Sequence, residues 1–349
     1  MKMILRKIPA VLLLLVLSTA VYAAETHGMT VLEREDRGSY DCLLVEYAVP
    51  GNEKVRSFLL LPHAASRENP CPGLVLLHDH GARFDIGKEK LARPLPSAPE
   101  NIRKSSGQWV RANFDGVYFA DSLASLGYAV IVPDMLYWGG RSSELCRRWS
   151  RMKFCGGEGD PDSVRTAVYE GQRAVYDSLM ANGTVWAEKT LVEDAAAAAL
   201  LRDLPCVYKD RIAALGWSMG AHRAWMLAGF CDFIVSGVSV SWMTLKETVT
   251  MPYKASDFAM LVPELRAEHD FPDIAHLLAP RPYCFLSGRS DRLFPEPVVR
   301  EAFSVMQKIY REEGAEGRLE TVFFDGGHHC GKPVQRLVVD FLEKTVPLR

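Results

Sequence analysis

A serine between two glycines is the first feature of this sequence that could do chemistry. Residues 216–220 read Gly-Trp-Ser-Met-Gly, directly after the apolar run 212–215 and before a helical pattern that continues to Phe230. A sharp turn from a strand into a helix holds a serine hydroxyl exposed above a sheet, and the flanking glycines relieve crowding in the strained backbone. This setting predicts that Ser218 is a nucleophile.

A serine hydroxyl is a weak nucleophile near neutral pH, so it needs a general base and a group that orients that base. Asp291 follows the predicted strand 283–287 and is the candidate orienting acid. A simpler alternative is that Asp291 caps its turn or pairs with Arg289 or Arg292.

Two histidines follow the predicted strand 319–324 and are the candidates for the base. We favour His328, because it comes directly after a Gly-Gly turn, and keep His329 as the alternative. The acid and the base then each emerge at the carboxyl end of a strand, where ligand sites of open parallel sheets lie. The sequence therefore predicts a Ser218–His328–Asp291 triad.

Acyl transfer also needs hydrogen-bond donors for the oxyanion of the tetrahedral intermediate. One predicted donor is the backbone N–H of Met219. The other should come from the loop after the predicted strand 73–77, and we assign it to Ala82, with Gly81 or Arg83 as alternatives.

A metal-dependent hydrolase is a competing interpretation, because several residues have side chains that ligate zinc. Against it, His78 and His80 would point to opposite sides if their strand continued, and a metal site leaves Ser218 unexplained. The set is His78, Asp79, His80, His328 and His329.

Short apolar runs alternate with longer helical patterns, which is typical of an α/β fold with a mostly parallel central sheet and helices on both faces. We find no linker that would separate two domains, so residues 24–349 are predicted to form one α/β domain. The predicted strands are 43–48, 57–61, 73–77, 129–132, 212–215, 235–239, 283–287 and 319–324, the first two as an antiparallel edge hairpin. The predicted helical segments are 116–126, 163–204, 219–230, 298–311 and 332–344.

Two stretches, 83–112 and 138–162, do not fit this alternation and are predicted to be loop insertions at the rim of a substrate cleft. Aromatic and polar residues near these loops and the nucleophile could line a substrate pocket, although burial in the core is the commoner fate of such aromatics. The candidates are Trp217, Trp138, Trp109 and His80.

The N-terminus is typical of a signal peptide, with Lys2, Arg6 and Lys7 before an apolar run and small residues ending at Ala23. The run is too short to span a bilayer comfortably, so we expect cleavage after Ala23 and a periplasmic or secreted protein without stable membrane insertion. The formal net charge of -2 gives no general attraction for nucleic acid.

Export would permit disulfides among the eight cysteines. Cys146 and Cys155 share one irregular segment and could close a short loop, whereas the other six are predicted to be small buried residues.

These motifs resemble the α/β-hydrolase superfamily and, within it, the dienelactone hydrolase and acetyl xylan esterase-like branch, over nearly the whole predicted mature chain. Besides the serine motif, the resemblance rests on three segments. They are His78-Asp79-His80-Gly81 with the following Gly-Lys-Glu-Lys at 87–90, Pro133-Asp134 with Gly-Gly-Arg-Ser at 139–142, and Ala-Pro-Arg-Pro at 279–282.

The resemblance implies Ser218, Asp291 and His328 as nucleophile, orienting acid and general base, with no cofactor. Dienelactone hydrolases proper carry Cys at the elbow, and Ser218 instead favours ordinary ester hydrolysis. Secreted members of this branch often act on acyl groups of polysaccharides, which suggests a small-molecule or polysaccharide ester as substrate. A peptidase of the same fold and a non-catalytic binding protein are the alternatives.

Overall fold

The computed structural model describes residues 28–51, 53–246 and 267–348. The predicted signal peptide 1–23 lies outside these residues. None of the described helices combines the length and the hydrophobicity that a membrane span needs.

Nine described strands form one sheet in the order β1-β2-β3-β5-β4-β6-β7-β8-β9. Strands β1 to β3 pair antiparallel, β3 pairs antiparallel with β5, and every pairing from β5 to β9 is parallel. The strands are β1 Thr30–Asp36, β2 Tyr40–Val49, β3 Glu53–Pro62, β4 Cys71–Leu77, β5 Ala129–Pro133, β6 Val207–Trp217, β7 Ile234–Val240, β8 Tyr283–Gly288 and β9 Leu319–Phe324. The predicted α/β class with a mostly parallel sheet is confirmed.

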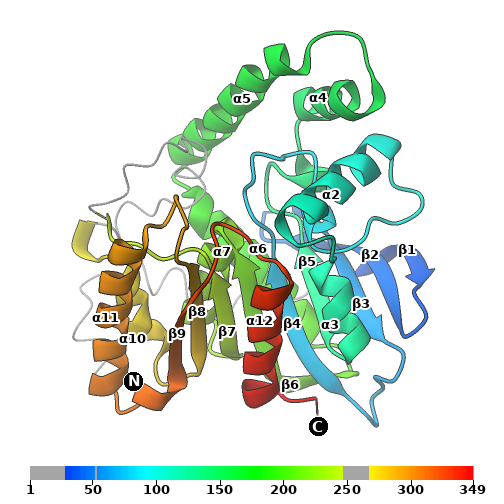
Figure 1. Cartoon of the computed structure of the whole chain (residues 1–349). Helices are drawn as coiled ribbons and strands as arrows, with labels where there is room; N and C mark the ends of the chain where they lie inside the picture. Colours follow the sequence, from blue (N-terminus) through cyan, green and yellow to red (C-terminus); the bar gives the residue numbers. More distant parts are fainter. Residues whose placement is uncertain (1–27, 52, 247–266, 349) are drawn as a thin grey trace.

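Helices cover both faces of this sheet, and two of them, α4 and α5, extend beyond it (Figure 1). The α-helices are α2 Glu100–Asn113, α3 Phe119–Leu126, α4 Glu144–Cys155, α5 Pro161–Ala181, α6 Trp186–Arg202, α7 Met219–Phe230, α10 Ala275–Leu278, α11 Glu296–Glu312 and α12 Lys332–Thr345. Short 3-10 helices are η2 Lys88–Lys90, η3 Gly139–Arg141, η5 Phe271–Ile274 and η6 Glu316–Arg318.

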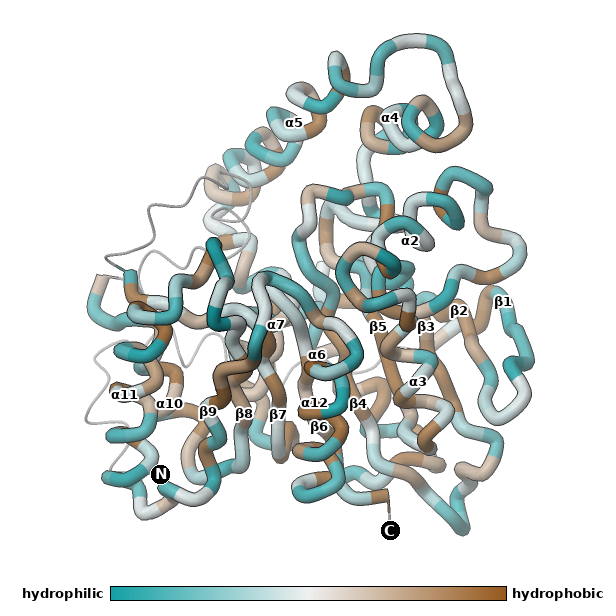
Figure 2. Tube along the Cα trace, viewed as in Figure 1, coloured by the Kyte–Doolittle hydropathy of each residue, from teal (hydrophilic) through white to brown (hydrophobic). Residues whose placement is uncertain are grey.

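Two hydrophobic clusters lie on opposite faces of the sheet. Residues of α6, α7 and α11 pack in one cluster, and residues of α3 and α12 pack in the other. Figure 2 shows the hydrophobic residues concentrated along the strands, while α5 carries many hydrophilic positions. The central strands are buried on both faces, which is why their sequences are continuous apolar runs.

The sequence prediction differs from the structure at three places. Strand β1 was not predicted, because its sequence is rich in charged residues and it lies exposed at the sheet edge. The predicted helical stretch 163–204 is two helices, α5 and α6, separated at Gly183, which has a φ of +71°. The stretches 83–112 and 138–162 are not plain loops, because they hold η2, α2, η3, α4 and the start of α5.

The possible bond between Cys146 and Cys155, which the sequence left open, is absent from this structure, where all eight cysteines are free. Both residues belong to α4. A helix rises about 1.5 Å per residue, so their Cα atoms lie roughly 13 Å apart, well beyond the reach of about 7 Å that a disulfide allows.

We therefore expect iodoacetamide to modify all eight cysteines when the protein is denatured without reductant. Mass spectrometry before and after reduction measures this directly. A gain in alkylation after reduction would show a disulfide that this fold does not accommodate.

Candidate active site

The turn from β6 into α7 places Ser218 in a strained backbone conformation. Its φ is 55° and its ψ is -128°, a region that residues with a side chain rarely occupy. The Ser218 N–H donates to the carbonyl of Val240 at 2.8 Å, which fixes the turn to β7. The strain is tolerated because the surrounding sheet and helix determine the turn.

The two glycines of the turn are required by backbone packing. A Cβ atom on Gly216 would lie 2.0 Å from the carbonyl oxygen of Gly220, and one on Gly220 would lie 1.9 Å from the carbonyl oxygen of Leu77. Both contacts are with backbone that belongs to the core of the fold, so neither neighbour can move aside.

We expect Gly216→Ala and Gly220→Ala to lower the free energy of unfolding by at least about 3 kcal/mol, because overpacking against rigid backbone cannot relax. Urea denaturation measures the change. Gly107→Ala on α2 is the control: its Cβ would meet only the end of Arg111, at 3.4 Å. That substitution should be neutral or stabilise the helix by about 0.5–1 kcal/mol. Elbow variants as stable as wild type would contradict the packing argument.

The structure brings the predicted triad residues into one hydrogen-bonded chain. Nε2 of His328 lies 2.9 Å from Oγ of Ser218, and Nδ1 of His328 lies 2.8 Å from Oδ2 of Asp291. The other carboxylate oxygen of Asp291 accepts hydrogen bonds from the N–H groups of Leu293 and Phe294, at 2.8 and 3.2 Å. The Asp291 side chain is fully buried, and His328 is one-fifth exposed. This geometry allows His328 to take the Ser218 proton while Asp291 holds its ring.

The alternative base, His329, takes another direction. Its Nε2 lies 3.3 Å from Oδ1 of Asp115, at the start of the loop that precedes α3. Of the two adjacent histidines, His328 is therefore the one placed against the serine.

Of the two predicted oxyanion donors, Met219 is the first residue of α7, and its N–H is among those that an α-helix leaves unpaired at its start. The N–H of Ala82 instead donates to Nδ1 of His80 at 3.0 Å. The N–H of Arg83 points to the carbonyl of His80 at 3.4 Å. In the described part of the chain, the N–H groups of His80 and Gly81 have no protein partner.

The four predicted pocket residues have different surroundings. The ring of Trp217 lies against the imidazole of His328, with centroids 5.0 Å apart, and the ring centroid of Trp109 lies 6.3 Å from that of Trp217. Trp138 is fully buried and donates its indole N–H to the carbonyl of His80 at 3.1 Å, so it supports the loop and faces no open pocket. His80 is also buried, and packs edge-on against Trp138.

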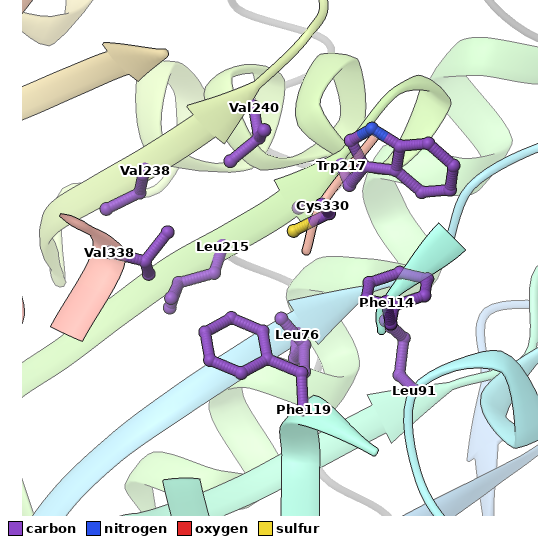
Figure 3. Close-up of a pocket in the computed structure, with 11 residues that line it drawn as sticks. Leu76, Leu91, Phe114, Phe119, Leu215, Trp217, Val238, Val240, Cys330 and Val338 are labelled. Atoms are coloured by element: carbon purple, nitrogen blue, oxygen red, sulfur yellow. The ribbon is translucent and has the colours of Figure 1, made fainter. Parts of the chain in front are cut away.

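A small apolar cavity lies beneath the elbow, on the face covered by α3 and α12 (Figure 3). Trp217 lines this cavity and contacts His328, so its ring separates the cavity from the triad. The other lining side chains are Leu76, Leu91, Phe114, Phe119, Leu215, Val238, Val240, Cys330 and Val338.

The proposed metal ligands do not gather in one place. His78 accepts a hydrogen bond from the N–H of Met135 through Nε2, at 3.1 Å, and its Nδ1 lies 3.0 Å from the carbonyl of Asp79. Within the described residues, ligand atoms clustered closely enough for an ion belong to Asp36, Asp41 and His63, near the β1 edge of the sheet. His78, His80 and His329 each contact another protein group instead.

Sequence reasoning missed the buried charges that support the loops of the site. Lys88 Nζ lies 2.7 Å from Oδ2 of Asp134, and the backbone N–H groups of Lys88 and Gly140 donate to the same carboxylate at 2.8 and 2.9 Å. Arg223 on α7 pairs with Asp194 on α6 through two contacts of 2.6 and 2.9 Å. The signal was present in the Gly-Lys-Glu-Lys and Pro-Asp segments, but the sequence alone does not show which charges are buried.

Burial also determines the protonation of the loop histidines. Desolvation, reinforced by the Lys90 cation, lowers the pKa of His80 to about 3, and burial likewise lowers the pKa of His78 well below its usual value. Because Nδ1 of His80 accepts the Ala82 N–H, the neutral ring carries its proton on Nε2.

A histidine whose pKa is lower in the folded state stabilises the fold above its unfolded pKa, and this contribution is lost as the pH falls toward the folded value. For His80 the window runs from 6.5 down to about 3. We expect wild type to lose about 2 kcal/mol more unfolding free energy between pH 6.5 and 4.5 than His80→Asn, whose side-chain oxygen can still accept the Ala82 N–H. Urea denaturation at the two pH values tests this. Equal losses in the two proteins would contradict the assignment of a neutral buried His80.

The turn between β6 and α7 carries Ser218, Asp291 follows β8 and His328 follows β9, which is the arrangement typical of the α/β-hydrolase fold. The chain therefore has the α/β-hydrolase fold. Residues 109–243 match the model of the dienelactone hydrolase family.

Similar proteins are hydrolases by description. The "Putative hydrolase YtaP" of Bacillus subtilis strain 168 is 25% identical over 315 residues, covering 90% of each chain. A crystal structure described as a "putative acetyl xylan esterase" from Bacteroides fragilis superposes with a TM-score of 0.65 and 18% identity, over 89% of this chain and 74% of that one. A glucuronoyl esterase from Solibacter usitatus gives a TM-score of 0.60 and 14% identity, over 94% and 91% of the two chains. At these identities the structural neighbours establish the fold.

Proposed function

We propose that this protein is a serine carboxylic ester hydrolase that works through an acyl-enzyme. The observation that carries the proposal is the continuous hydrogen-bond chain from Ser218 through His328 to Asp291. His328 takes the Ser218 proton as the hydroxyl attacks the ester carbonyl, and then returns it to the leaving alcohol. Water activated by the same imidazole releases the acid and regenerates the serine.

The oxyanion of each tetrahedral intermediate would be held by the Met219 N–H and a second donor from the loop 78–82. The Ala82 N–H is already used by His80, so we now favour the N–H groups of His80 and Gly81 for the second donor. Gly81 has a φ of +53°, and a Cβ there would meet the ring of Trp109 at 2.3 Å, so the loop needs glycine at this position.

The substrate class is proposed to be short acyl esters, including acetyl groups on polysaccharides. The similarity to proteins described as acetyl xylan and glucuronoyl esterases supports this. The expected signal peptide agrees with it, because polymeric carbohydrate is met outside the cytoplasm. Trp217, beside His328, and Trp109, beside Trp217, are the proposed wall for the acyl or sugar group.

The decisive experiment compares hydrolysis of p-nitrophenyl acetate, p-nitrophenyl octanoate, acetylated xylo-oligosaccharides and p-nitroacetanilide by the purified protein. We expect the acetyl esters to be cleaved fastest, with much slower reaction of the octanoate and the anilide. Preferential cleavage of the anilide would favour the peptidase alternative. Loss of activity on chelation, with no fluorophosphonate labelling, would favour a metal-dependent mechanism.

A further inference from the structure

The segment Gly-Lys-Glu-Lys at 87–90 takes no part in the triad, yet it carries a fully buried cation. Lys90 is 0% exposed. Its ammonium donates to the carbonyl oxygen of Asp79 at 2.7 Å and to that of His80 at 2.8 Å, and its third contact is Oδ2 of Asp79 at 3.4 Å. All the hydrogen-bonding capacity of this ammonium is thus directed at the loop after β4.

These contacts fix the direction of two backbone N–H groups. The carbonyl of Asp79 shares a peptide unit with the N–H of His80, and the carbonyl of His80 shares one with the N–H of Gly81. Both units are trans, so each N–H points opposite to its carbonyl. Since both carbonyls point at Lys90, both N–H groups point away from it, and neither has a protein partner among the residues described.

The same loop lies against the nucleophile turn. A Cβ on Gly220 would be 1.9 Å from the carbonyl oxygen of Leu77 and 3.0 Å from the carbonyl carbon of His78. The chain that leads into the loop therefore touches the first turn of α7, next to Ser218. The two unpaired donors belong to the second and third residues after His78, which makes this contact.

We propose that Lys90 is the positioning residue of the oxyanion hole: its ammonium orients and polarises the peptide units that present the His80 and Gly81 N–H groups to the oxyanion. A cation at the carbonyl end of a peptide unit strengthens the hydrogen bond that its N–H end donates. In a site shielded from water, fixed dipoles of this kind stabilise developing charge without reorganising. This inference rests on the proposed serine esterase function.

Trp109 and Asp79 keep the cation in place. The Trp109 indole N–H donates to Oδ1 of Asp79 at 3.3 Å, and the Lys90 ammonium lies 5.3 Å from the centre of the Trp109 ring. Lys88, two residues earlier on η2, points to Asp134 in the neighbouring loop instead. Two lysines on one turn thus support two different loops, which gives the experiment a matched control.

The test compares wild type, Lys90→Met and Lys88→Met with two inhibitors, an aryl trifluoromethyl ketone and the corresponding methyl ketone. The fluorinated ketone adds to Ser218 and places an oxyanion in the hole, whereas the methyl ketone binds largely without addition. Fluorophosphonate titration counts the active sites, so that kcat and KM are expressed per competent molecule.

For Lys90→Met we expect kcat/KM to fall about 10- to 100-fold, somewhat less than deletion of an oxyanion donor causes. Affinity for the trifluoromethyl ketone should fall by the same factor, and affinity for the methyl ketone should stay within about 2-fold. Lys88→Met should lower Tm but leave the ratio of the two affinities unchanged. If Lys90→Met lowers both affinities equally, or neither, the proposal is overturned.

If Lys90→Met does not fold, Lys90→Arg takes its place, because the larger, planar guanidinium keeps the charge but not the position of the compact ammonium between the two carbonyl groups. A selective loss of trifluoromethyl ketone affinity is again expected, and equal changes for the two ketones again overturn the proposal. Failure of the esterase function itself would be seen separately, as wild type that neither hydrolyses the acetyl ester nor reacts with fluorophosphonate.

Discussion

Replacing Ser218 with alanine will reduce hydrolysis of p-nitrophenyl acetate by about 10⁶-fold in kcat, the order of loss found when the nucleophile of a serine-hydrolase triad is deleted. The remaining reaction would come from substrate binding and the oxyanion donors. Labelling by a fluorophosphonate probe should disappear completely, because the probe forms its bond with Oγ of Ser218. Steady-state kinetics and gel fluorescence measure the two effects.

Ser290→Ala is the control for this experiment, since Ser290 is exposed in the loop that carries the acid and, among the described residues, has no hydrogen bond to His328. It should retain wild-type rates and labelling. Circular dichroism should show that Ser218→Ala keeps its fold. A folded Ser218→Ala protein that still hydrolyses the ester or accepts the probe would refute the assignment of the nucleophile.

Replacing Asp291 with asparagine will lower kcat by about 10⁴-fold with little change in KM. The carboxylate accepts from Nδ1 of His328 and from two backbone N–H groups. An asparagine keeps its oxygen on the backbone donors and turns its NH₂ group toward Nδ1. The imidazole proton must then sit on Nε2, the atom that has to accept the serine proton.

Asp325→Asn is the matched control, because Asp325 is fully exposed on the loop before His328. It should change kcat by less than about 2-fold. Comparable losses in the two variants would mean that general charge near the loop, and not the contact between Asp291 and His328, supports the reaction.

The positions of Ser218, Asp291 and His328 at strand ends could be predicted from the sequence because each residue follows a short apolar run. The strands before Ser218 and Asp291 are largely buried, and the strand before His328 is half-buried. The predicted C-terminal ends of these strands agree with those of β6, β8 and β9 to within two residues. Side-chain order along the chain then determined which groups could meet. The catalytic role of these residues remains a prediction until the variants are measured.

The supporting parts could not be predicted because their stability comes from tertiary contacts. Helix α4 is amphipathic, and its capping residues, Ser143 and Gly156, are visible in the sequence, but neighbouring glycines and tryptophans made the segment look irregular. The N–H of Ala82 was assigned to the oxyanion because nothing in the sequence shows that the ring of His80 turns back to accept it. Trp138 was expected at a pocket and is buried under the same loop.

The buried ion pairs have a consequence for how this protein can change. Lys88 with Asp134, and Arg223 with Asp194, are each almost completely enclosed. For Arg223 and Asp194, loss of one partner leaves the other charge unpaired in the core, at a cost of about 3–5 kcal/mol, whereas an apolar pair of matching shape can replace both at little cost. Lys88 also lies 2.8 Å from Glu89, so its cluster has three charged members. A protein that carries only one of the two substitutions is therefore less stable than both the wild type and the double variant. A mutant library made by successive single substitutions would therefore retain these buried charges, and only paired substitutions could replace them.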